Sequence, residues 1–81
     1  MARRDFEYLS ELYDIETIAQ GTGVRARHIL NRQFGKKYKW FKKKGKALIQ
    51  YSDGRIVEAE IHWFEARGIG RVDEKSIKEL N

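Results

Sequence analysis

The side chains best suited to chemistry lie in residues 59–75. Metal-independent cleavage of RNA needs a base for the ribose 2′-hydroxyl, an acid for the leaving oxygen and cations for the phosphate. His62 is the candidate for proton transfer because imidazole titrates near neutral pH, and Glu65 is the candidate to orient it or to act as its partner. Arg67, Arg71 and Lys75 are the candidates to hold the phosphate. The alternative is a hydrogen-bonded structural histidine beside a surface ion pair of Glu65 and Arg67.

The basic middle of the chain is a second candidate site. Residues 17–52 contain ten Lys or Arg and no Asp or Glu, in a chain of formal net charge +5. A field of one sign favours a polyanion, and we expect a nucleic acid, RNA rather than DNA; the alternative is a solvated lysine surface. Aromatic residues among the lysines could stack on unpaired bases, although strand alternation places either Trp40 or Phe41 in the core. The predicted contacts are Arg25, Arg27, Arg32, Lys36, Lys37, Lys39, Trp40, Lys42, Lys43, Lys44 and Lys46.

Apolar residues at helical spacing predict helices in the first part of the chain. The first is expected after Asp5 and a shorter one after Asp14, each capped by that aspartate. The third is expected from Thr22 to Gly35, where the glycine ends it. The expected buried residues are Phe6, Leu9, Leu12, Tyr13, Ile15, Ile18, Ala19, Val24, Ala26, Ile29, Leu30 and Phe34.

After Gly35 the apolar period changes to two, which predicts strands. We expect strands at 38–42, 46–51 and 55–64, a fourth strand or a loop at 71–77, a tight connection at 43–45 and a hairpin turn around Asp53 and Gly54. On the third strand His62 shares the polar face with Glu58 and Glu60. The prediction is one α+β domain, residues 1–81, with two or three N-terminal helices (about 5–35) packed on a three- to four-stranded antiparallel meander (about 37–77).

Residues 59–71 read A-E-I-H-W-F-E-A-R-G-I-G-R, and Lys75 follows. This segment resembles the motif A-E-[IV]-H-W-[YF]-E-A-[HR]-G-I-G-[RK] of small uncharacterised bacterial proteins and toxin-like C-terminal domains, and the likeness extends over roughly residues 15–75. The order of elements also looks like that of barnase-like and RelE-like RNase toxins. The resemblance implies an endoribonuclease with an immunity or antitoxin partner. Arg67 stands where the motif usually has a second histidine, so a two-histidine mechanism does not carry over.

A helix-turn-helix is the alternative interpretation of residues 15–31. Ala19, Gly23 and Ile29 have a spacing that resembles bacterial repressor motifs. The helix after Gly23 would then enter the major groove of DNA with Arg25, Arg27 and Arg32, and the lysine-rich hairpin would act as a wing. This interpretation predicts a DNA-binding regulator without catalytic activity.

Composition argues against several other classes. The chain has no cysteine and only two histidines, His28 and His62, far apart in sequence, so we expect neither a metal site nor a cofactor. Its apolar runs are too short for a transmembrane helix or a signal peptide. We therefore expect a cytoplasmic protein without a membrane partner.

Overall fold

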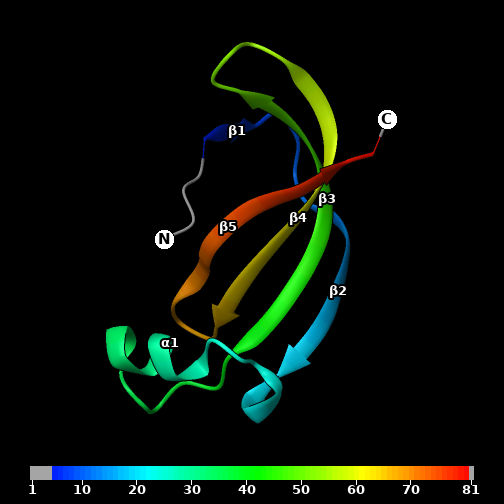
Figure 1. Ribbon diagram of the computed structural model, residues 1–81. Helices are drawn as coiled ribbons and strands as arrows, with labels where there is room; N and C mark the ends of the chain where they lie inside the picture. The colour runs from blue at the N-terminus through cyan, green and yellow to red at the C-terminus, as the bar shows by residue number, and fades with distance from the viewer. Residues whose placement is uncertain (1–4, 81) are drawn as a thin grey trace.

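The computed structural model describes residues 5–80, which form five strands, one α-helix and one 3-10 turn (Figure 1). The prediction of two or three helices packed on a meander is wrong, because most of the described chain is antiparallel sheet. The elements in chain order are β1 (Phe6–Tyr8), β2 (Tyr13–Gln20), the 3-10 turn η1 (Gly21–Gly23), α1 (Arg27–Phe34), β3 (Phe41–Tyr51), β4 (Ile56–Ala66) and β5 (Gly70–Glu79).

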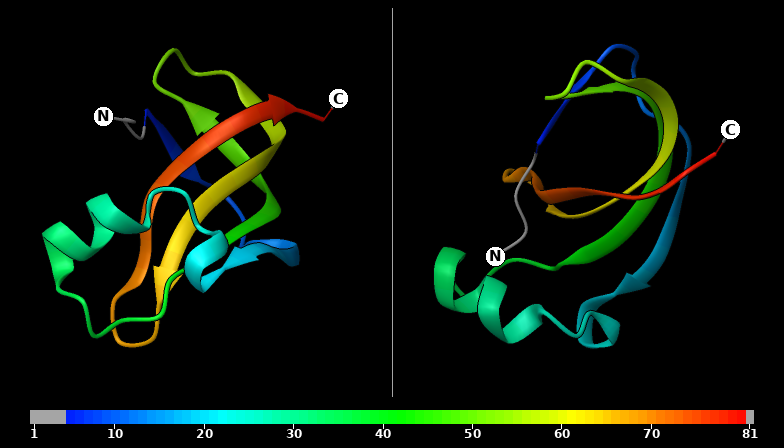
Figure 2. Two further views of the ribbon diagram at one scale, coloured as in Figure 1. Left: turned by 60° about the horizontal axis from the view of Figure 1, so that its bottom comes forward. Right: turned by 45° about the horizontal axis from the view of Figure 1, so that its top comes forward.

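The sheet is antiparallel and curls into a half-barrel (Figure 2). β4 lies between β3 and β5, and β1 and β2 pair with the two ends of the other edge of β3. The curl brings the ends of the sheet together: the Tyr8 hydroxyl of β1 donates to Glu74 of β5, and the hydroxyls of Tyr51 and Ser76 lie 2.7 Å apart. The face that carries Tyr8 and Tyr51 is therefore the inner face.

The first two predicted helices are strands. In β1 the side chain of Phe6 is buried and packs edge-on against Tyr8 and Tyr51, so alternation rather than helical spacing decides this segment. β2 is an edge strand whose pairing with β3 is interrupted by two register shifts. These irregularities hide the period of two, and Ile15 and Ile18 remain about half exposed.

The third predicted helix is confirmed in part. α1 begins at Arg27, five residues later than expected, because Gly21–Gly23 forms the 3-10 turn. It ends where predicted: Gly35 has a φ of 100° and donates its N–H to the carbonyl of Asn31.

The strand predictions after Gly35 hold except in two places: the strand expected at 38–42 begins only at Phe41, and no connection interrupts it at 43–45. The hairpin around Gly54, strand β4 and strand β5 are confirmed, but the connection expected at 43–45 is the middle of β3. Gly45 pairs with Ile61 across the sheet, and the ring of Trp63 lies over it. This glycine serves close packing inside a strand, not a turn.

Two hydrophobic cores lie on opposite faces of the sheet, because neighbouring residues of β4 point to opposite sides. Trp63 belongs to the inner core with Phe6, Ile49 and Ile61. Phe64 belongs to an outer core with Val24, Leu30, Trp40 and Ala66, which fixes α1 to the outer face beside the turn between β4 and β5 (Figure 1).

Candidate nucleic-acid interface

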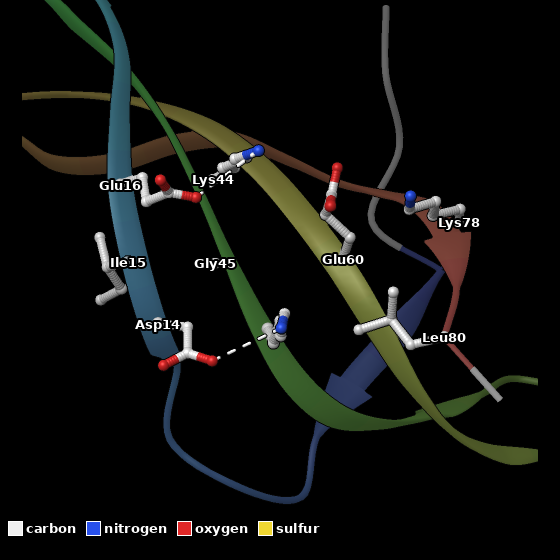
Figure 3. A pocket seen from close by; sticks show the side chains of 9 residues that line it. Asp14, Ile15, Glu16, Lys44, Gly45, Glu60, Lys78 and Leu80 are labelled. Carbon is white, nitrogen blue, oxygen red and sulfur yellow. Dashed lines mark ion pairs between the residues drawn. The ribbon is translucent and has the colours of Figure 1, made fainter.

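The Lys and Arg residues of segment 17–52 form two groups, one paired with carboxylates and one without carboxylate partners in the described part of the chain. The lysines on the middle of β3 are paired: Lys43 Nζ lies 3.1 Å from Glu65, Lys44 Nζ 3.6 Å from Glu16 and Lys46 Nζ 3.5 Å from Asp14. Figure 3 shows Asp14 and Glu16 of β2 beside β3, with Glu60 and Lys78 on the following strands. This hollow of about 570 Å³ has carboxylates and lysines in alternation, so it does not concentrate positive charge.

The Lys and Arg residues around α1 form the group without carboxylate partners. None of them pairs with a carboxylate of residues 5–80, and all but Arg27 and Lys42 are exposed. They lie on α1, on the turn before it, on the segment that leads into β3 and, for Lys42, at the start of β3, at one end of the sheet (Figure 2). We call this set the basic end; it consists of Arg25, Arg27, Arg32, Lys36, Lys37, Lys39 and Lys42.

The aromatic residues of this segment have different roles. Trp40 is 1% exposed and packs against Phe34 and Tyr38, so a nucleobase cannot stack on it without opening the outer core. Trp40 is therefore a core residue and not a binding residue. Tyr38 and Phe41 are partly exposed, and Lys37 and Lys39 lie 5.3 Å and 5.5 Å from the centres of their rings.

His62 lies on the outer face in a row of charged residues. Its Nε2 is 2.7 Å from a carboxylate oxygen of Glu60, and its cross-strand neighbours are Lys44 and Lys75. The hydrogen bond with His62 lowers the pKa of Glu60. Glu60 was not among the predicted site residues, although its position two residues before His62 on a strand placed both on one face.

The five predicted catalytic residues do not converge on one site. Glu65 lies on the inner face, where it accepts hydrogen bonds from Trp63 Nε1 (2.7 Å) and Lys43 Nζ (3.1 Å). Burial acts to raise the pKa of Glu65, but these hydrogen bonds outweigh it and the pKa lies below its usual value.

The predicted phosphate-holding residues are separated as well. Arg71 is the cross-strand neighbour of Glu65 on β5, away from His62, and pairs with Glu74 at 3.2 Å. Arg67 is exposed in the turn between β4 and β5, and neither of the expected contacts of Glu65, with His62 or with Arg67, is made. Only His62 and Lys75 of the five share the outer face as neighbours.

The helix-turn-helix interpretation is wrong. The segment expected to form its first helix, including Ala19, is strand β2, and Gly23 closes a 3-10 turn. Ile29, expected on the buried side of the second helix, is 59% exposed. Arg27 and Arg32 therefore lie on a short helix packed on a sheet, and Arg25 lies on the turn before it.

Residues 5–80 contain no cluster of three or more His, Asp or Glu side chains arranged to hold a metal ion. No helix in the same range is long and apolar enough to span a membrane. Comparison with protein-family models, with curated proteins and with solved structures gave no match to this chain. The likeness of residues 59–71 to toxin-like domains stays a prediction.

Proposed function

We propose that this domain binds RNA through the basic end. The observation that carries the proposal is the absence of carboxylate partners from its seven bases within residues 5–80, while the lysines in the middle of β3 are neutralised. Lys and Arg residues without a carboxylate partner release the counterions condensed on RNA when they contact its phosphates. Lysines that are already paired with a carboxylate contribute less to this release. The partly exposed rings of Tyr38 and Phe41 beside lysines favour a single strand, because they can stack on unpaired nucleobases.

The proposal is tested with two variants of equal charge change. Lys36→Gln/Lys37→Gln/Lys39→Gln removes three lysines of the basic end, and Lys44→Gln/Lys46→Gln/Lys78→Gln removes three lysines of the mixed-charge hollow. Fluorescence anisotropy with a single-stranded RNA should show about tenfold weaker binding or more for the first variant and less than about threefold for the second. Equal losses in the two variants would contradict the proposal, because net charge alone would then explain them.

Metal-independent cleavage of the bound RNA is a second candidate function, and the contact between His62 and Glu60 favours it. With Nε2 facing the carboxylate, Nδ1 is the nitrogen that can take a proton from a ribose 2′-hydroxyl, and Glu60 then stabilises the imidazolium. Lys75 lies beside the ring on β5 and could contact the phosphate, whereas Lys44, on the other side of the ring, pairs with Glu16.

Cleavage of a single-stranded RNA in EDTA measures this second function. His62→Ala should lower the rate about 100-fold or more, and Glu60→Gln about tenfold, because one removes a proton-transfer group and the other its orienting charge. His28→Ala is the matched control: this histidine is exposed on α1 and should leave the rate unchanged. Cleavage that survives His62→Ala, or no cleavage by the unmodified protein, would rule out a catalytic His62.

A further inference from the structure

A groove runs along the outer face between α1 and β5. Its apolar part, of about 470 Å³, is lined by Ile29 and Gln33 of α1 and by Phe64, Val72 and Asp73 of the sheet. A smaller hollow of about 90 Å³ continues it along the sheet, lined by Lys42, His62 and Lys75. Phe64 and Asp73 line both, so the two hollows adjoin each other between α1 and His62. Its larger part falls within the range of small-ligand sites.

Asp73 stands at the junction of the two parts in an unusual backbone conformation. Between the pairs His62–Lys75 and Phe64–Val72, β5 has two residues opposite one of β4, which is a β-bulge. Asp73 lies in this bulge with a φ of 57°, in the left-handed region that favours glycine. It has neither an ion pair nor a side-chain hydrogen bond within residues 5–80. Backbone strain of this kind clusters at ligand-binding and active sites, and the exposed Asp73 carboxylate is open to a ligand in the groove.

We propose that the groove receives one unpaired base of the bound RNA, with guanine preferred. This inference rests on RNA binding by the basic end. The apolar walls at Ile29 and Val72 suit the faces of a base, and Asp73 offers two acceptor oxygens to its edge. Guanine presents two adjacent N–H donors on its Watson–Crick edge, whereas uracil presents one, so the carboxylate discriminates between them.

The other end of the groove suits the phosphate attached to that base. Lys42 Nζ lies 5.9 Å from the centre of the Phe64 ring, and Lys75 is the cross-strand neighbour of His62. A nucleotide with its base beside Asp73 therefore has cations beside its phosphate. The combination of apolar walls, one acceptor pair and a basic end matches a nucleotide rather than an apolar peptide.

The test uses oligouridylates of about eight nucleotides that carry a single central guanine, adenine or cytosine, or none. The unmodified protein should bind the guanine-containing strand about tenfold more tightly than the all-uridine strand, the scale of a bidentate hydrogen-bonded pair. Asp73→Asn and Asp73→Gly should each abolish this preference and preserve the fold, because both residues tolerate a positive φ. Ile29→Ser should weaken binding of the guanine-containing strand several-fold, because it removes an exposed wall of the groove.

Asp14→Asn and Asp14→Gly are the matched controls. Asp14 is the other described non-glycine residue with a positive φ, 52°, and it lies on β2, outside the groove. Its variants should keep the guanine preference. Binding of all four strands with equal affinity would overturn the base pocket and leave RNA binding intact, whereas binding of none would overturn both. A concentration-dependent molecular mass that Asp73→Asn abolishes would assign the groove to a second copy of the chain and would also overturn the pocket.

Discussion

Gly45→Ala should destabilise the domain through crowding at the centre of β3. A Cβ atom at this position would lie 3.1 Å from Cη2 of Trp63, 3.2 Å from Cγ1 of Ile15 and 3.3 Å from the backbone oxygen of Tyr13. All three distances are shorter than ordinary van der Waals contact between such atoms. Trp63 is 2% exposed and is hydrogen-bonded through Nε1, so its ring has little freedom to move away.

The expected loss follows from two opposing effects. Overpacking of a filled core costs about 1–3 kcal/mol. Replacing glycine by alanine in a strand returns about 0.5–1 kcal/mol of conformational entropy. The net loss in the free energy of unfolding should be about 1.5 kcal/mol, which corresponds to a fall in Tm of roughly 6–12 °C for a domain of this size.

Urea titration at equilibrium measures this loss, and the variant should lower the midpoint without changing the slope. Trp63→Phe provides the mechanistic control, because phenylalanine has no Cη2 atom. In a double-mutant cycle the cost of Gly45→Ala should fall by about half or more in the Trp63→Phe background. A Gly45→Ala protein as stable as the unmodified one, or the same cost in both backgrounds, would refute the contact between Gly45 and Trp63.

Two further substitutions test the cores and the Glu65 hydrogen bonds. Trp40→Phe should cost about 1 kcal/mol less stability than Trp63→Phe in urea titrations, because Nε1 of Trp63 donates to Glu65, while Nε1 of Trp40 has no hydrogen-bond partner within residues 5–80. Glu65→Gln should destabilise the domain by about 1 kcal/mol or less at neutral pH, because this carboxylate is only partly buried. Because folding lowers the pKa of Glu65, its carboxylate stabilises the folded state at pH values above the usual pKa of 4.5, and this stabilisation is lost as the pH falls through the folded-state pKa. The Tm values of the unmodified protein and of Glu65→Gln should therefore converge in acid and stay apart in alkali.

The second half of the fold could be predicted from the sequence because its signals are local. Asp53 and Gly54 mark the hairpin, and the alternation from Val57 to Trp63 defines both faces of β4. The first half could not, because the spacing of Phe6, Leu9 and Leu12 fits a helix, whereas the strands that form there pair with residues 41–51 much later in the chain. Strand pairing at such a distance outweighs local propensity.

The candidate site shows the same division. The shared face of Glu60 and His62 follows from alternation within one strand. The pairing of Lys44 with Glu16 and of Lys43 with Glu65 depends on the register between strands, which the composition of residues 17–52 does not contain. The sequence therefore predicted one continuous positive field, and within residues 17–52 the structure confines the Lys and Arg residues without a carboxylate partner to the basic end.

The salt dependence of RNA binding tests the central proposal most directly. For single strands, the logarithm of the binding constant falls with the logarithm of salt concentration by about 0.7 per neutralised phosphate. Lys36→Gln/Lys37→Gln/Lys39→Gln should therefore reduce the magnitude of this slope by about 2, and Lys44→Gln/Lys46→Gln/Lys78→Gln should reduce it by less than about 0.7. Equal slopes for the two variants, or a slope near zero for the unmodified protein, would contradict binding through the basic end.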